Sequence, residues 1–254
     1  MFWAVALWAA CVGLGAGVVR GFAGFGFSVL CMAGLTWLIS PSLLVPVIVV
    51  LEMTASLLMW HGSAAEADGR WLRALVVGNL FSVPLGLGLL LFVPQHSLQV
   101  LVALSLLLAA LGLRFVLRAT WSDTWRLRGL TGLASGWMNG MAASGGVVAA
   151  MFMTAAGLPG ARLRATMVFF LLFSDSLMLV LMLAATAWDL PIANALFNAH
   201  SLTLALLMGL PMALGIQLGQ RRFRRTGAQD FRRFVLNLLM LISGLGLLLI
   251  AWRP

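Results

Sequence analysis

The sequence predicts an all-α membrane protein that crosses the bilayer many times. Hydrophobic residues make up 62% of its 254 residues and charged residues only 9%, whereas a soluble domain carries about 25% charged residues. A soluble globule of this composition would leave large apolar patches in contact with water. The apolar residues form runs along the whole chain, and most runs reach the roughly 18 residues that indicate a transmembrane helix. These observations exclude a soluble enzyme, a nucleic-acid-binding domain and a secreted disulfide scaffold.

We predict about eight to ten hydrophobic helical segments separated by short breaks. They cover residues 2–19, 22–39, 42–60, 71–92, 97–117, 128–141, 145–157, 163–187, 193–219 and 232–252. The first segment lacks the positive residues that begin a signal peptide, so we expect it to belong to the mature protein. Cys11 and Cys31 both lie in apolar segments, so no disulfide framework is indicated.

The arginines predict how the segments are oriented. The net charge is +9, and 14 of the 16 basic residues, all arginine, lie in four loops near residues 70–73, 114–128, 162–164 and 221–233. The loops at 40–42, 93–97 and 188–195 contain no arginine. Following the segments in order places all four arginine-rich loops on one side, which the positive-inside rule makes cytoplasmic. Both termini are then expected outside.

Two glycine-rich stretches predict an internal repeat. Their glycines have the same spacing at an offset of 119 residues, with Gly13, Gly17, Gly21 and Gly26 in the first stretch and Gly132, Gly136, Gly140 and Gly145 in the second. Segments 42–60 and 163–187 are equivalent but run in opposite directions across the membrane. We therefore predict two inverted-topology repeats, at 1–118 and 129–254, joined by a cytoplasmic linker at 119–128. Many transporters are built this way, with the substrate site near the midplane.

The glycine-rich stretches are also predicted to contain broken or re-entrant helices. Segments 128–141 and 145–157 would each be about 20 Å long, which is shorter than the ~30 Å hydrocarbon core. Irregular backbone at membrane depth is tolerated where protein or a water-filled cavity covers it. The alternative is that glycines spaced by four only allow helices to pack closely.

Arg20 is the first candidate for anion binding. It is the only arginine outside the loops and the C-terminal tail, and a charge at membrane depth usually has a function. The turn at 21–26 would begin a half-helix whose free N–H groups attract anions, so the backbone near Gly24 and Gly26 joins the predicted site. The second glycine-rich stretch is predicted to complete it with Asn139, Ser144, Gly145 and Gly146. Alternatively, Arg20 is structural and either snorkels or pairs with a carboxylate.

Two carboxylates lie deep in apolar segments. Glu52 is in the third segment and Asp175 in the eighth, and the offset of 119 matches Asp175 with Ser56, one helical turn from Glu52. We predict that they couple protons to transport or balance the charge of Arg20. The alternative is a structural polar contact between helices. No catalytic constellation, metal-ligand spacing or cofactor motif is present.

Four motifs carry a resemblance to a known family. They are GVVRGFAGFGF at 17–27, SPSLLVP at 40–46, VLE at 50–52 and GLASGWMNGMAASGG at 132–146. In their order and spacing they resemble the sulfite exporter TauE/SafE family, also called the toluenesulfonate uptake permease family, over most of the chain. The resemblance implies a bacterial inner-membrane transporter for sulfite, organosulfonates or related small sulfur-containing anions.

We therefore predict an alternating-access transporter that exports a small anion. Its expected partners are this anion and the lipid bilayer, with a homodimer possible and no nucleic acid. A passive anion channel would use the same residues without needing Glu52 or Asp175. A membrane scaffold subunit would transport nothing. An intramembrane enzyme is a distant third alternative, because no nucleophile–base pair is visible.

Overall fold

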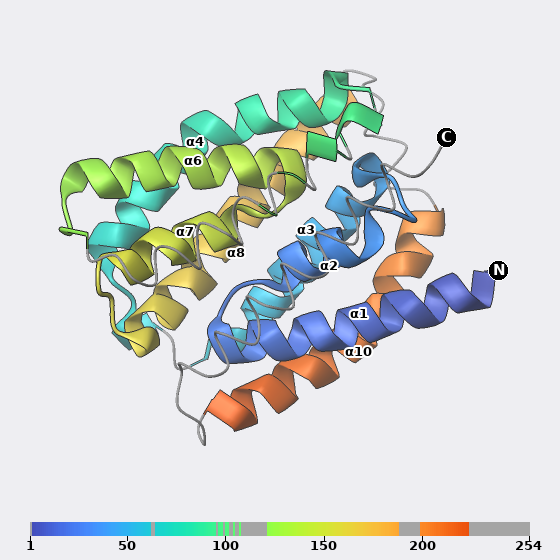
Figure 1. The fold of residues 1–254 in the computed structure, drawn as a ribbon, viewed down its shortest axis with the longest axis horizontal. Coiled ribbons are helices and arrows are strands. Elements are labelled where there is room, and N and C mark those ends of the chain that lie inside the picture. The colour runs from blue at the N-terminus through green and yellow to red at the C-terminus, as the bar shows by residue number, and fades with distance from the viewer. Residues whose placement is uncertain are drawn as a thin grey trace.

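A computed structural model describes residues 2–61, 64–94, 121–187 and 199–223, together with 96–98, 100, 101, 104 and 107. This part of the chain is helical (Figure 1). Most of the predicted segment 97–117 and all of 232–252 lie outside the described residues, as do residues 119–120 of the predicted linker. The arginines at 114, 118, 224, 225, 232 and 233 lie outside them as well.

The described helices follow the predicted segments closely. They are α1 (Phe2–Ala23), α2 (Phe27–Leu35), α3 (Pro41–Met59), the 3-10 helix η1 (Ala64–Glu66), α4 (Gly69–Phe92), α6 (Trp125–Ala142), α7 (Gly145–Ala155), α8 (Gly160–Ala187) and α10 (Ala199–Phe223). Five of them, α1, α3, α4, α8 and α10, are long and apolar enough to cross a membrane. The predicted all-α, multi-pass architecture is therefore confirmed.

Local chemistry sets where several helices begin. Pro41 occupies the first position of α3, where its missing N–H costs no hydrogen bond. Asp68 caps α4 by accepting hydrogen bonds from the backbone N–H groups of Arg70 and Trp71. Thr124 caps α6 in the same manner, through the N–H of Leu127.

The helices form two outer pairs around an inner group. In Figure 1, α1 lies beside α10 on one side and α4 beside α6 on the other, with α2, α3, α7 and α8 between them. The glycines explain how closely the outer pairs approach. A Cβ on Gly17 would lie 3.0 Å from Cα of Met212 in α10, and one on Gly136 would lie 2.8 Å from Cα of Asn79 in α4. Larger residues there would push the helices apart, so the glycines do pack helices.

Helix boundaries recur at the offset of 119. Both α1 and α6 end at equivalent positions, Ala23 and Ala142, and α3 and α8 begin at the equivalent Pro41 and Gly160. The outer pairs also correspond, because α1 packs on α10 as α6 packs on α4. Each outer pair therefore joins one helix from each predicted repeat. The inverted orientation of the repeats in a membrane remains a prediction.

The short helices are α2 and α7. At 9 and 11 residues they are about 14 and 17 Å long, well short of a ~30 Å hydrocarbon core. By contrast, α1 continues through Arg20 to Ala23, and α6 has 18 residues where the sequence predicted 14. The chain therefore breaks at 24–26 and 143–144, after a long helix and before a short one.

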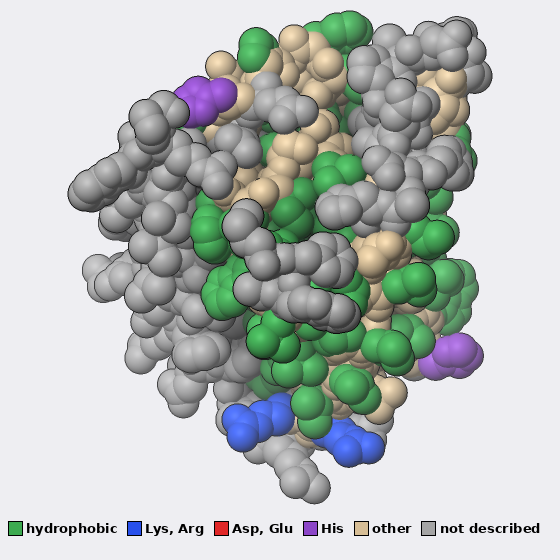
Figure 2. Space-filling model, turned by 90° about the vertical axis from the view of Figure 1, so that its right-hand side faces the viewer, with side chains coloured by type: hydrophobic (Ala, Val, Ile, Leu, Met, Phe, Trp, Pro, Cys, Tyr) green, Lys and Arg blue, Asp and Glu red, His purple; other side chains and the backbone are tan. Residues whose placement is uncertain are grey.

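Apolar side chains cover much of the described surface. Figure 2 shows a face on which hydrophobic side chains spread over the described helices while basic side chains lie at its lower edge. Large residues such as Leu7, Phe92 and Leu210 are more than two-thirds exposed. This is the surface expected of helices that contact lipid rather than water.

Candidate anion site at the helix breaks

Arg20 lies in the last turn of α1 and is completely buried. Its Nε is 2.9 Å from Oε2 of Glu52 in α3, and its Nη2 donates a 2.6 Å hydrogen bond to Oγ of Ser56. Nη1 donates to the carbonyl oxygen of Gly24, just beyond the helix. The guanidinium group thus connects α1, the chain break after it and one face of α3.

The chain break beside Arg20 depends on glycine. Gly24 and Gly26 have φ angles of 82° and 97°, which L side chains rarely adopt. Gly24 also packs against α8, where an added Cβ would lie 2.8 Å from Cγ of Arg164. These two glycines let the chain turn sharply and begin α2 next to the guanidinium group.

Glu52 lies between two sources of positive charge. While Oε2 faces Arg20, Oε1 accepts a 3.1 Å hydrogen bond from the backbone N–H of Ser28. Ser28 lies in the first turn of α2, where N–H groups lack helical partners and the helix dipole favours an anion. The predicted half-helix terminus therefore exists, and in this structure a carboxylate of the protein lies against it.

The second glycine-rich stretch contains an equivalent cluster. Nδ2 of Asn139, in α6, donates to Oγ of Ser174 at 2.8 Å and lies 3.4 Å from Oδ1 of Asp175, both in α8. Ser174 in turn donates to Oδ1 of Asn79 in α4 at 2.6 Å. Within the described residues, Oδ1 of Asn139 and Oδ2 of Asp175 are buried without a hydrogen-bond partner.

The two clusters correspond at their central contact. The offset of 119 matches Arg20 with Asn139 and Ser56 with Asp175, and Arg20 contacts Ser56 as Asn139 contacts Asp175. It also matches Gly24 with Ala143, and both have positive φ. The helices that carry Glu52 and Asp175, α3 and α8, pack against each other, so the two clusters lie on neighbouring helices.

The remaining predicted residues lie at the start of α7. Oγ of Ser144 donates to the carbonyl oxygen of Ala142 at 2.8 Å and is buried. A Cβ on Gly145 would lie 2.9 Å from Cβ of Asn139, whereas one on Gly146 would meet the side chain of Leu171 at 3.2 Å. Gly145 thus lets α7 pack closely on α6 beside Asn139, and Gly146 lets it pack closely on α8.

Several polar residues of the clusters were not predicted from the sequence. Serines are common in apolar helices and do not stand out in the sequence, but Ser28, Ser56 and Ser174 are all buried and contact a predicted site residue. The offset of 119 could have revealed Ser56, because it already matched Ser56 with Asp175. The contact of Ser28 is made by its backbone, and residue identity carries no signal for that.

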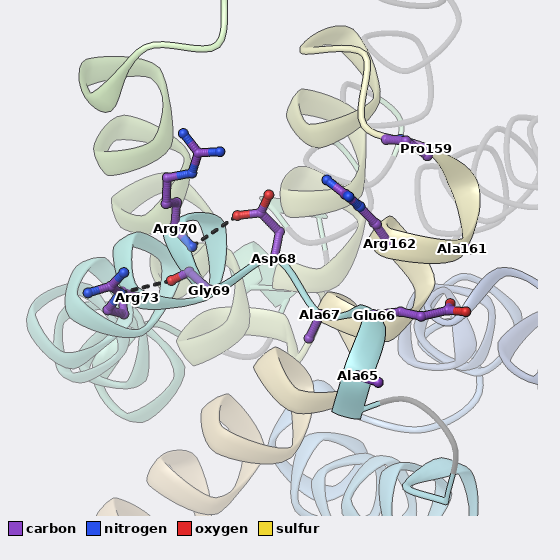
Figure 3. A pocket seen from close by; sticks show the side chains of 10 residues that line it. All are labelled: Ala65, Glu66, Ala67, Asp68, Gly69, Arg70, Arg73, Pro159, Ala161 and Arg162. Carbon is purple, nitrogen blue, oxygen red and sulfur yellow. Dashed lines mark hydrogen bonds between the residues drawn. The ribbon is translucent and has the colours of Figure 1, made fainter.

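A surface pocket of about 640 Å³ lies near the starts of α4 and α8. Figure 3 shows Arg70 and Arg73 on one side and Arg162 on another, with Asp68 between them and Glu66 beside Ala67. Two residues after Arg162, Arg164 donates a 3.0 Å hydrogen bond to the carbonyl oxygen of Gly21, next to Arg20. The start of α8 therefore links this arginine-lined pocket to the buried cluster.

Within the described residues, no three His, Cys, Asp or Glu side chains come together in a way that could hold a metal ion.

Comparison with known proteins identifies the family. Neither the curated proteins nor the solved structures contain a match to the chain. The family model described as "Sulfite exporter TauE/SafE" matches residues 9–247, which is nearly the whole chain. That region contains both helix breaks and both polar clusters. The chain belongs to the sulfite exporter TauE/SafE family of membrane transporters.

Proposed function

We propose that this protein carries a small sulfur oxyanion, sulfite or an organosulfonate, across the bacterial inner membrane by alternating access. The observation that carries the proposal is the buried set of donors around Arg20. A guanidinium group, a hydroxyl group and the first turn of a short helix converge there at the end of α1. The family match supports a transporter and leaves the substrate to experiment.

The donor geometry suits an oxyanion. Guanidinium groups donate in a planar fork that matches carboxylate, phosphate and related anions. The N–H of Ser28 adds a donor at a helix start, where anions are stabilised. Arg20 now faces one oxygen of Glu52 as an ion pair, and the N–H of Ser28 donates a hydrogen bond to the other. A sulfonate or sulfite oxygen pair can replace the carboxylate between these two groups.

This replacement provides a way to couple transport to protons. In a buried site, a second anion beside the charged Glu52 would be strongly repelled. Protonation of Glu52 removes that repulsion and releases Arg20 for the substrate. Asp175 and Asn139 contribute from the other repeat, where two buried acceptor oxygens have no donor in the described residues. A proton on Asp175 would give one of them a donor.

The repeats give the alternating movement its structural basis. Each outer helix pair joins one helix from each repeat, so rocking one repeat against the other would move the break at 24–26 relative to that at 143–144. We place the arginine-lined pocket of Arg70, Arg73 and Arg162 on the cytoplasmic side, following the positive-inside rule. An anion for export would be attracted there first, and Arg164 would lie on its route to Arg20.

The test is anion flux into proteoliposomes containing the purified protein. Sulfite, sulfoacetate and acetate are offered with and without a pH gradient to wild type, Arg20→Gln and Arg128→Gln. Arg128 is the matched control because its ion pair with Asp123 is partly exposed. We expect gradient-driven flux of a sulfur anion that Arg20→Gln abolishes and Arg128→Gln retains. Absence of flux in wild type would favour the scaffold alternative.

Glu52→Gln tests the coupling separately. A glutamine has no charge to remove, so flux should persist but lose its dependence on the pH gradient. Unchanged gradient dependence in both Glu52→Gln and Asp175→Asn would contradict coupling by these carboxylates. Wild-type flux that ignores the gradient would indicate a passive channel.

A further inference from the structure

A groove of about 750 Å³ runs along the outer face of α4 and α6. Two arginines line it, Arg73 and Arg126, and all its other lining residues are apolar or glycine. Its largest apolar side chains, Phe81, Trp125 and Leu130, are each about two-thirds exposed or more. The groove is separate from the buried clusters, and Arg73 is the one residue that it shares with the arginine-lined pocket at the starts of α4 and α8.

The groove is polar at one end and apolar along the rest of its length. Arg73 lies in the first turns of α4 and Phe81 two turns further on, so the apolar part extends about 12 Å along the helix. The two helices run side by side in the same direction, because Gly78 meets Gly132 as Gly86 meets Gly140. Both arginines therefore lie at the same end, where each helix begins.

The two positive charges have no acidic neighbour in the groove and would attract an anionic partner. Nε of Arg73 donates to the carbonyl oxygen of Gly69 at 3.0 Å, which keeps the side chain at the start of α4. The guanidinium carbon of Arg126 lies 5.6 Å from the centre of the Trp125 ring, a cation–π geometry that orients it beside the groove. Neither arginine has an ion pair with a described acidic residue.

We propose that this groove binds one anionic phospholipid, with its phosphate at Arg73 and Arg126 and an acyl chain along Val77, Phe81 and Leu130. The helix α4 is one of those long enough to span the membrane, so a groove along its outer face meets acyl chains. Interfacial tryptophan and arginine are the side chains that normally contact lipid headgroups. The charge of the two arginines selects an anionic headgroup over a zwitterionic one.

Glycine provides a sharp test. A Cβ on Gly129 would meet no atom within 4 Å, so Gly129→Trp fills the groove without disturbing the packing of α6 on α4. Gly88, on the same α4 helix but not lining the groove, is equally free of neighbours, and Gly88→Trp is the matched control. The third variant, Arg73→Gln with Arg126→Gln, removes the charge while keeping the groove.

The measurement is lipid binding by the full-length protein in detergent, read by native mass spectrometry and by thermal unfolding. Phosphatidylglycerol, phosphatidylcholine and free glycerol phosphate are the three ligands. We expect phosphatidylglycerol to bind and stabilise the protein, with an affinity about 25-fold lower in the double arginine variant, from about a factor of five per arginine. Gly129→Trp should abolish binding and Gly88→Trp should leave it unchanged.

Three results would overturn the proposal. Equal binding of phosphatidylcholine would show that the arginines do not select the headgroup. Equal stabilisation by glycerol phosphate would show a small-anion site without a place for the acyl chain. Dimers that Gly129→Trp dissociates, without bound lipid, would show that a second copy of the chain occupies the groove.

Discussion

Breaking the Arg20–Glu52 pair from either side should destabilise the protein, and removing both charges should restore most of the stability. Both side chains are at most 1% exposed, and a buried charge that loses its partner costs about 3–5 kcal/mol. Arg20→Met and Glu52→Gln should therefore each lower the free energy of unfolding by that amount. If the two effects were independent, the double variant would lose about 6–10 kcal/mol. At roughly 2–4 °C per kcal/mol, each single change lowers Tm by about 6–20 °C.

The double variant should lose far less. Without either charge, the remaining cost is the carbonyl oxygen of Gly24, which loses its donor Arg20, at about 1–3 kcal/mol. The hydroxyl group of Ser56 loses the same donor but can turn to donate to a carbonyl oxygen of its own helix. The glutamine at position 52 keeps an acceptor for the N–H of Ser28. The two substitutions should therefore be non-additive by at least about 3 kcal/mol, a difference a double-mutant cycle resolves.

The assay is chemical unfolding in detergent micelles, followed by the fluorescence of the ten tryptophans. Asp123→Asn provides a control, since its pair with Arg128 is partly exposed. A double variant that loses the full sum of the single losses would refute the reasoning. That result would mean that the two charges are stabilised independently, and the argument that an anion replaces Glu52 at Arg20 would lose its basis.

Three further predictions use the same unfolding assay. Gly17→Ala should lower the free energy of unfolding by roughly 1–3 kcal/mol, because the added Cβ would crowd the backbone of α10. Gly15→Ala adds a Cβ with no atom within 4 Å and should raise the free energy of unfolding by up to about 1 kcal/mol. Equal effects would contradict the close packing. Asn79→Ala removes hydrogen bonds to α6 and α8 and should cost about 2 kcal/mol, from roughly 0.6 each; no loss would argue against this network. Asp123→Asn should change stability by less than about 1 kcal/mol, and the change should shrink further in high salt; a larger loss would show that its pair with Arg128 is shielded from solvent.

Much of the candidate site could be predicted because its residues are conspicuous in an apolar chain. An arginine at position 20 and carboxylates at 52 and 175 stand out where most neighbours are Leu, Val or Gly. The spacing of the glycines predicted where the helices break, and the structure places the breaks within a few residues of those positions. The predicted turn at 21–26 contains the observed break, whereas the predicted first segment, 2–19, ended early because α1 continues to Ala23.

Partners were much harder to predict than positions. The sequence left open whether Glu52 or Asp175 balances Arg20, because both lie at similar depth in equivalent segments. In the fold, Glu52 contacts Arg20 while Asp175 contacts Asn139. The choice depends on which turn of α3 or α8 faces each helix break, and helix rotation is decided by packing against all neighbours together.

The sequence by itself determined the membrane class, the approximate positions of the described α-helices, and the polar residues that lie among them. These follow from local properties, since a run of apolar residues must form a helix to satisfy its backbone in lipid. Only the tertiary structure decided that α1 pairs with α10 and α4 with α6, and that the N–H of Ser28 reaches Glu52. Such contacts join residues far apart in the chain, and in the two outer pairs glycines let one helix backbone lie directly against another.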